Sequence, residues 1–169
     1  MAADLYVPDA NVFLEYIYAR PLHDISKTIM RDAVLEKIQL AVPCLLLDEI
    51  TEVLCGNMEN LADVQAHLRH LENLARQKVL HVVVPSCALR MKAVELARTG
   101  NKKSGWPELS DCLYHALAIL HDGVFVTNDR RHFAKVKQFS HIMLLEEYGG
   151  KNCSPAERSE AMPCLSKKQ

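Results

Sequence analysis

The amino-acid sequence predicts an α/β fold with three layers, in which helices flank a central, mostly parallel sheet. Short apolar runs alternate along the chain with longer segments that repeat apolar residues every three or four positions. Parallel neighbours require crossover connections, which helices usually provide. With 169 residues, the chain is long enough for one such domain with its own core.

The strands are predicted from short apolar runs that end at turn-forming residues. The first run stops at Pro8, and the β-branched run 79–84 ends at Pro85, which is typical of a buried strand. We expect strands over residues 5–7, 40–42, 79–84, 124–126 and 142–145.

The helices are predicted from the three-to-four residue period and from their end signals. Asp24 is a candidate N-cap, and Pro43 and Pro107 each suit the start of a helix. We expect helices over residues 12–18, 25–38, 43–54, 61–75, 88–97, 107–120 and 132–136.

The apolar pattern stops after Gly149 and Gly150, so we expect one domain over 1–149 and a disordered C-terminal tail over 150–169. The six cysteines form no C-x-x-C pair, and several lie inside apolar runs. They are typical of buried free thiols and indicate neither a zinc site nor a disulfide framework.

The charge balance argues against a strongly basic nucleic-acid binder, because the net charge is only −1. Any nucleic-acid contact must then be local. The N-terminal segment lacks the features of a secretion signal, and no apolar run approaches the length of a membrane span. We therefore expect a cytoplasmic protein and no membrane partner.

Two aspartates follow predicted strands. Asp9 comes directly after the first strand, and Asp129 closes the run that contains the strand 124–126. Each has a simpler interpretation, since aspartate commonly caps the next helix or stabilises a turn. However, the carboxyl ends of parallel strands share one sheet edge, which is where ligands bind.

Two further acids lie on predicted helices. On a helical wheel Glu49 falls at the margin of the apolar stripe, next to Leu45, Leu46 and Val53. A carboxylate turned toward a core is unfavourable unless it is paired or bound to a metal. Asp111 lies in the first turns of its helix, where a negative charge also suits the helix dipole.

If the fold gathers these four carboxylates at one edge, they repel one another. They stay ionised at neutral pH only if a hard divalent cation offsets that repulsion. The sequence therefore points to metal-dependent chemistry on a phosphate-bearing substrate.

In four stretches the chain resembles the PIN-domain ribonucleases, in particular the VapC-type toxins of toxin–antitoxin pairs. The stretches are VPDANVFLEY, VPCLLLDEITEVL, LSDCLYHALAI and FVTNDRRHF, in the order and rough spacing of that family, and the resemblance covers about residues 4 to 145. It implies a PIN-like three-layer fold.

The resemblance also implies a function, an endoribonuclease that hydrolyses RNA phosphodiester bonds with one or two Mg²⁺ or Mn²⁺ ions. It implies that the ions are held by Asp9, Glu49, Asp111 and Asp129, with support from Asn11, Thr127 and Asn128. In this scheme Asp9 and Asp129 are the main ligands, and Glu49 binds the metal or orients the attacking water. An antitoxin partner and a homodimer are further expectations, with the apolar face of 61–75 as a dimer surface or as part of the core.

An RNA substrate needs positive charge beside the acids. Basic residues that could flank the metal are Arg98, Lys102, Lys103, Arg130, Arg131, His132, Lys135 and Lys137. The simpler interpretation, a solvated surface, suits Lys102 and Lys103 best. Trp106 and Tyr114 are candidates to stack on a base, with packing as the alternative.

Two other functions remain open at this point. A phosphatase of the haloacid dehalogenase kind also begins with an aspartate after a strand, but it needs a second aspartate where this chain has Asn11. A PIN-like module that binds RNA or protein without cutting is the other alternative, although all four acids are present.

Overall fold

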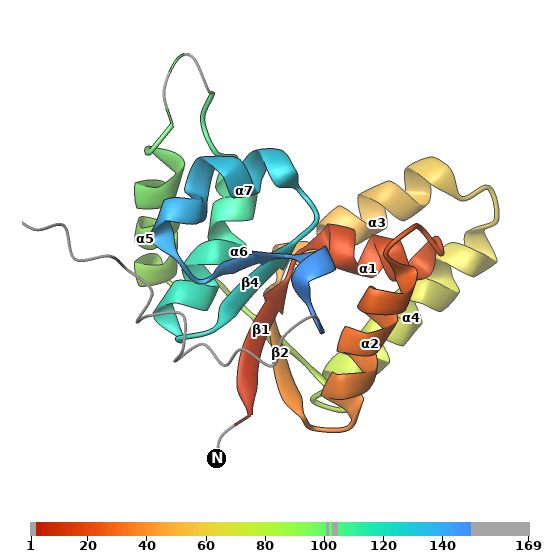
Figure 1. Cartoon of the computed structure of the whole chain (residues 1–169). Coiled ribbons are helices and arrows are strands. Elements are labelled where there is room, and N and C mark those ends of the chain that lie inside the picture. Colours follow the sequence, from red (N-terminus) through yellow and green to blue (C-terminus); the bar gives the residue numbers. More distant parts are fainter. Residues whose placement is uncertain (1–2, 101, 103–104, 150–169) are drawn as a thin grey trace, which may run out of the picture.

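A computed structural model describes residues 3–100, 102 and 105–149 of the chain. Five strands form a single sheet in the order β3-β2-β1-β4-β5, and every neighbouring pair is parallel (Figure 1). The strands are β1 (Asp4–Pro8), β2 (Ile38–Pro43), β3 (Leu80–Val83), β4 (Val124–Thr127) and β5 (Ile142–Leu144). The predicted parallel sheet is confirmed.

The helices form a layer on each side of the sheet. Helices α1 to α4 lie on one side, and α5, α6 and α7 lie on the other (Figure 1). Their bounds are α1 (Ala10–Ile17), α2 (His23–Val34), α3 (Leu45–Asn57), α4 (Leu61–Arg76), α5 (Cys87–Ala97), α6 (Leu109–Leu120) and α7 (Arg130–Val136), with short 3₁₀ turns at Lys137–Phe139 and Leu145–Glu147. This confirms the three-layer α/β fold.

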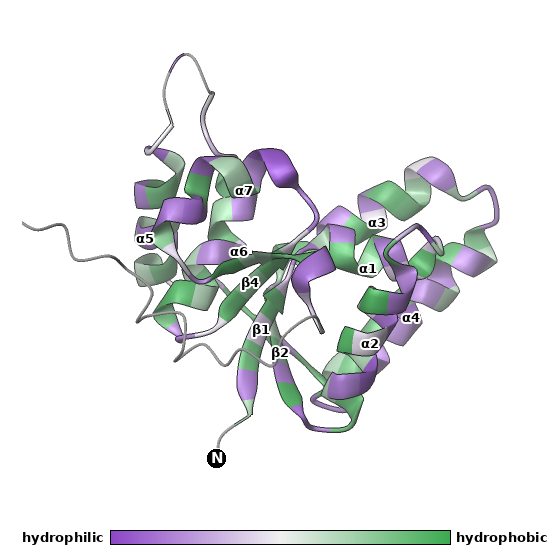
Figure 2. Cartoon of the chain, viewed as in Figure 1, coloured by the Kyte–Doolittle hydropathy of each residue, from purple (hydrophilic) through white to green (hydrophobic). Residues whose placement is uncertain are grey.

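The core lies on both faces of the central strands. These strands are largely apolar, whereas the helices carry both apolar and polar residues (Figure 2). Val7 on β1 and Phe125 and Val126 on β4 are fully buried. Helix α6 packs against β1, β2 and β4 on one side and against α5 on the other. It is therefore buried around most of its circumference, and residues that it contributes near the sheet edge are held rigidly.

The strand order creates a switch point beside β1. The chain runs from β1 outward to β2 and β3, and then returns to place β4 on the other side of β1. The register sets Pro8 opposite Val126, and the Asp9 N–H donates to the Val126 carbonyl over 3.0 Å. Ligands of open parallel sheets bind at such a point, outside the carboxyl ends of the strands.

The predicted helix 25–38 is wrong at both ends. Asp24 is not the N-cap; Leu22 occupies that position and Asp24 lies in the first turn of α2. The helix ends at Val34, Glu36 takes a left-handed backbone with φ 57°, and Ile38 begins β2. Ile38 continues the helical period by coincidence, so spacing alone could not show the turn.

Two predictions about strands are also corrected. Pro43 does not open a helix but ends β2, where it pairs with Val83, and α3 begins at Leu45. Strand β3 is not fully buried, because it lies at the edge of the sheet and only its first residue, Leu80, is shielded from solvent. Similarly, α6 begins at Leu109 rather than at Pro107.

The apolar face of α4 belongs to the core. Val64, Leu71 and Leu74 are buried within the chain, so this face is not a free dimer surface. Of the cysteines in the described residues, Cys112 is buried, Cys44 is half-buried, and Cys55 and Cys87 are exposed, all as free thiols. Burial was therefore predicted correctly for only part of the set.

The predicted tail over 150–169 lies outside the described residues. Among the helices that are described, none combines the length and the apolar character that crossing a bilayer requires.

At Gly123, just after α6, the backbone lies close to β1, and a substitution can test this close approach. A Cβ at this position would meet the Leu5 carbonyl oxygen at 2.9 Å, and backbone cannot move aside cheaply. We expect Gly123→Ala to lower the free energy of unfolding by about 1–3 kcal/mol, measured by urea denaturation. The control is Gly56→Ala in α3, where a Cβ meets nothing within 4 Å; this change should be neutral or slightly stabilising. Equal effects of the two changes would contradict the close approach.

Candidate active site

Asp9 lies at the carboxyl end of β1 and is buried. One carboxylate oxygen accepts a hydrogen bond from the Val12 N–H over 3.1 Å, so Asp9 caps α1. The other oxygen accepts from the Thr127 hydroxyl over 2.5 Å. The capping interpretation is therefore correct, and it coexists with a position at the switch point.

Asp129 follows β4 and caps α7 through the backbone N–H groups of Arg131 and His132, at 2.7 and 3.1 Å. Its own N–H donates to the Thr127 hydroxyl oxygen over 2.9 Å. Thr127 thus connects the two strand-end aspartates, because its hydroxyl donates to Asp9 and accepts from Asp129. The predicted supporting role of Thr127 has a clear structural basis.

Glu49 projects from α3 and is half-buried. Its carboxylate accepts a hydrogen bond from the Tyr114 hydroxyl over 2.5 Å. Tyr114 is fully buried and stacks on Phe125, so it cannot stack on a base, and that prediction is wrong. Its hydroxyl instead holds the Glu49 carboxylate, and this bond joins α3 to α6.

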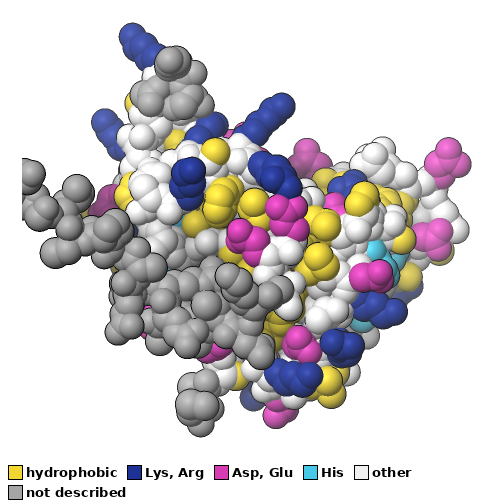
Figure 3. All heavy atoms as spheres, in the orientation of Figure 1, with side chains coloured by type: hydrophobic (Ala, Val, Ile, Leu, Met, Phe, Trp, Pro, Cys, Tyr) yellow, Lys and Arg dark blue, Asp and Glu magenta, His cyan; other side chains and the backbone are white. Residues whose placement is uncertain are grey.

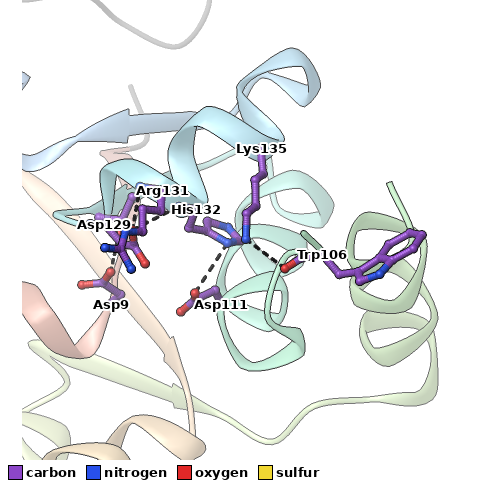
Figure 4. A network of polar contacts seen from close by, with 8 residues as sticks. Asp9, Trp106, Asp111, Asp129, Arg131, His132 and Lys135 are labelled. Atoms are coloured by element: carbon purple, nitrogen blue, oxygen red, sulfur yellow. Dashed lines mark hydrogen bonds and ion pairs between the residues drawn. The ribbon is translucent and has the colours of Figure 1, made fainter. Parts of the chain in front are cut away.

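Asp111 lies in the first turn of α6, as predicted. Its pKa is raised to about 7, first by burial and then by the negative charges of Asp9, Glu108, Asp129 and Glu49. All three of the other predicted acids therefore lie within electrostatic reach of Asp111. Figure 4 shows Asp9 and Asp129 close together, with Asp111 facing them from the helix.

Burial also raises the pKa of Asp9 to about 7, against the opposing effect of the hydrogen bonds from Thr127, Val12 and Asn11. Asn11 makes its contribution through its backbone, while its side chain is exposed. The pKa of Glu49 is raised as well, again chiefly by burial. Without a cation, the cluster therefore binds protons far more readily than ordinary carboxylates do.

The four acids thus come from four separate elements and share one region. Within the described part of the chain, however, no three His, Cys, Asp or Glu side chains are oriented to hold a metal ion by themselves. Any ion placed here must draw part of its coordination from water or substrate.

His132 does not belong to a basic surface. The side chain is buried, and burial lowers its pKa to about 4, so the ring is neutral at pH 7. Its Nδ1 lies 3.5 Å from the Asp111 Oδ2 (Figure 4). A cationic role in substrate binding is therefore wrong for this residue.

Glu15 is a buried acid that the sequence did not single out. Its carboxylate accepts from the Leu22 N–H over 2.9 Å and from the Asn128 side-chain amide over 3.1 Å. These bonds connect α1, the turn before α2 and the turn between β4 and α7. The bond from Asn128 therefore fixes the segment that carries Asp129.

The basic residues differ in availability. The Arg130 guanidinium pairs with Glu146 over 2.5 Å, and the Lys135 ammonium donates to the Trp106 carbonyl over 3.0 Å. Arg131 and Lys102 are exposed, whereas Lys103 lies outside the described residues. On the face that Figure 3 presents, basic and acidic side chains both occur among apolar and other residues.

Comparison with known proteins identifies the family. The PIN domain matches residues 6–138, which is most of the chain, and the protein belongs to the PIN domain family. No curated protein sequence matches the chain.

Solved structures with the same fold include the following three. VapBC-1 from nontypeable Haemophilus influenzae aligns with a TM-score of 0.61 at 16% identity, over 84% of this chain and 98% of that one. VapBC2 from Rickettsia felis, bound to a DNA fragment from its promoter, gives 0.60 at 20% identity, over 83% and 96%. A toxin–antitoxin complex from Klebsiella pneumoniae gives 0.55 at 16% identity, over 85% and 98%. At these identities the likeness shows the fold.

The crowding of the acids predicts an unusual dependence of stability on pH. Because the pKa of Asp111 is about 7 in the folded chain and near 3.8 in the unfolded chain, the folded state binds its proton more tightly. This contribution to stability is complete below pH 3.8 and is lost as the pH rises through 7. In EDTA at pH 8, Asp111→Asn should therefore be more stable than wild type by roughly 2 kcal/mol.

Urea denaturation at pH 8 and pH 4 measures this effect, and the difference should be much smaller at the lower pH. Asp63→Asn is the control, because Asp63 lies in the first turn of α4 but is exposed and outside the cluster. The control should be neutral or slightly destabilised. A destabilised Asp111→Asn at pH 8 would show that the acids do not repel one another in the folded chain.

Proposed function

We propose that this protein is a metal-dependent endoribonuclease that hydrolyses RNA phosphodiester bonds. The observation that carries the proposal is the electrostatic coupling of Asp111 to Asp9, Glu49 and Asp129, in a member of the PIN domain family. The family match favours this reaction over that of a haloacid dehalogenase-like phosphatase.

The donor set suits Mg²⁺ or Mn²⁺. Carboxylate oxygens are the ligands that these hard cations prefer, and one or two positive ions would offset the burial and the repulsion that raise the pKa of Asp9 and Asp111. Magnesium also keeps several waters and needs only one or two protein carboxylates. The absence of a closed three-ligand cage among the described residues is consistent with such an ion.

Asp9 and Asp129 would be the principal ligands, since they flank the switch point, and Asp111 would bind directly or through water. When bound, the ion lowers the pKa of a coordinated water and stabilises the leaving oxygen. Glu49 is suited to orient the attacking water, and the Tyr114 hydroxyl fixes its carboxylate. Thr127 holds Asp9 in place from the neighbouring strand.

The substrate would be single-stranded or looped RNA, whose backbone can reach a site at a sheet edge more easily than a duplex can. Arg131 is exposed next to Asp129, and Lys102 is exposed in the segment that leads to α6. Trp106 is 55% exposed and is available to stack on a base. The local character of these contacts agrees with the near-neutral charge of the chain.

A toxin–antitoxin role is the biological context that we propose. It is supported by the fold shared with VapBC-1 from Haemophilus influenzae and with the toxin–antitoxin complex from Klebsiella pneumoniae. The partner would be an antitoxin that covers the acids, for example by inserting an arginine or a helix. A homodimer belongs to the same proposal, on a surface other than the buried face of α4.

Replacing Asp9 tests the reaction. Asp9→Asn keeps the cap of α1 and the shape of the side chain but removes a charge, so Mn²⁺-dependent cleavage of a mixed RNA should fall about 100-fold or more. EDTA should abolish cleavage by the wild type, and Asp63→Asn should cleave normally. Equal cleavage by wild type and Asp9→Asn, or cleavage that survives EDTA, would refute the proposal. RNA that is bound but never cut would instead indicate the non-catalytic binding module.

A pair of adjacent arginines tests the substrate contact. Arg130 is already paired with Glu146, whereas Arg131 is exposed beside the acids. Arg131→Ala should weaken RNA binding and reduce the slope of log affinity against log salt by about 1, while Arg130→Ala changes it less. Fluorescence anisotropy with a labelled oligonucleotide at several salt concentrations measures both. A larger effect for Arg130→Ala would place the RNA elsewhere.

A further inference from the structure

We infer that His132 is a positioning residue that orients Asp111 for metal binding; this inference rests on the proposed function. The first observation is that His132 contacts two of the four acids at once. Its ring Nδ1 lies 3.5 Å from the Asp111 Oδ2, and its backbone N–H donates to the Asp129 Oδ1 over 3.1 Å. It therefore couples α7 to the first turn of α6 (Figure 4).

The ring itself is firmly held. His132 is only 3% exposed, and its imidazole meets the Phe125 ring edge-on with 5.8 Å between centroids. Phe125 is fully buried on β4. A ring packed in this way has little freedom to turn, so the position of its Nδ1 is set by the core of the domain.

The partner of Nδ1 decides where the ring proton lies. Once Asp111 is ionised, as metal binding requires, its carboxylate oxygens only accept hydrogen bonds, so an attractive contact requires the proton on Nδ1. The Nε2 atom is then bare, and it is buried without any hydrogen-bond partner in the described part of the chain.

An unpaired buried nitrogen is unfavourable, and an apolar side chain would fill the same space without it. Packing therefore does not explain a histidine at this position. The contact with Asp111 does explain it, because it is the polar interaction that the ring makes within the described residues.

His115 provides a matched comparison. It is also fully buried and stacks on Phe125 with 5.8 Å between centroids. However, its Nε2 contacts the Ser140 carbonyl over 2.7 Å, and Ser140 is not one of the four acids. Two histidines thus share one aromatic neighbour, but only His132 has a ring nitrogen directed at a carboxylate of the cluster.

Residues that hydrogen-bond to a metal ligand influence how well the metal binds. A donor that fixes a ligating carboxylate typically contributes 10- to 100-fold, as an order of magnitude, to metal affinity or activity. The 3.5 Å contact is long for a hydrogen bond, and such contacts often tighten in the working complex. His132 would limit the orientations of Asp111 before the ion arrives.

Mn²⁺ binding to the full chain, measured by electron paramagnetic resonance of the free ion, tests the inference without relying on cleavage. We expect His132→Leu and His132→Gln to weaken binding about 10- to 100-fold. His132→Asn should stay within about 3-fold of wild type, because its amide nitrogen can take the place of Nδ1. His115→Gln, with its amide at the place of Nε2, is the control and should bind normally.

Circular dichroism checks that each variant folds; if His132→Leu does not fold, the comparison of His132→Gln with His132→Asn carries the test. Unchanged binding by His132→Gln, or a loss in His132→Asn as large as the loss in His132→Gln, would overturn the positioning role. A wild type that neither binds Mn²⁺ nor cleaves RNA would instead overturn the proposed function.

A second measurement determines which ring nitrogen of His132 carries the proton. Nitrogen-15 spectra of the imidazoles in the metal-free chain, recorded well above pH 7 so that Asp111 is ionised, should show the proton on Nδ1 of His132 and on Nε2 of His115. The opposite tautomer at His132 would overturn the inference whatever the metal affinity, because the ring could then not donate to Asp111.

Discussion

The parallel pairing of β1 with β4 is the constraint on which the rest of the site depends. It brings together residues that are 118 positions apart, so that the Thr127 hydroxyl donates to Asp9. The same hydroxyl accepts from the Asp129 N–H. One short side chain therefore sets the spacing of the two strand-end carboxylates, and both helices that begin there, α1 and α7, are oriented by the acids that cap them.

Bringing acids together at this edge opposes stability. Burial and mutual repulsion raise the pKa of Asp9 and Asp111 to about 7, so the metal-free site is protonated much more readily than isolated aspartates. The fold compensates with hydrogen bonds to individual carboxylates, from Thr127 to Asp9 and from Tyr114 to Glu49. Unfavourable charge burial of this kind is typical of functional sites, which often reduce the stability of the fold.

The turn between β4 and α7 is fixed from two sides. Glu15 holds the Asn128 amide from α1, and His132 reaches Asp111 from the first turn of α7. Asp129 lies between Asn128 and His132 in the sequence. Its position is therefore determined by buried polar contacts with separate elements, which allows a short segment at the protein surface to hold a carboxylate as rigidly as a strand would.

Local periodicity was sufficient to predict the alternating strands and helices, and the order of the four acids along the chain was sufficient to predict one shared edge. The period of apolar residues and the order of the acids can both be read directly from the sequence. The ends of elements such as α2 were not predictable, since Ile38 continues a helical spacing although it belongs to β2. Turn geometry decided that boundary.

The sequence by itself therefore determined the class of fold and singled out four acids whose charges interact in the folded chain. Only the tertiary structure decided that Tyr114 is a buried donor to Glu49, that Glu15 holds Asn128, and that His132 is neutral rather than part of a basic surface. The physical reason is that the charge and hydrogen-bonding role of a polar side chain depend on its burial and its partners. Those partners come from distant parts of the chain, which the residue's own neighbours in sequence do not reveal.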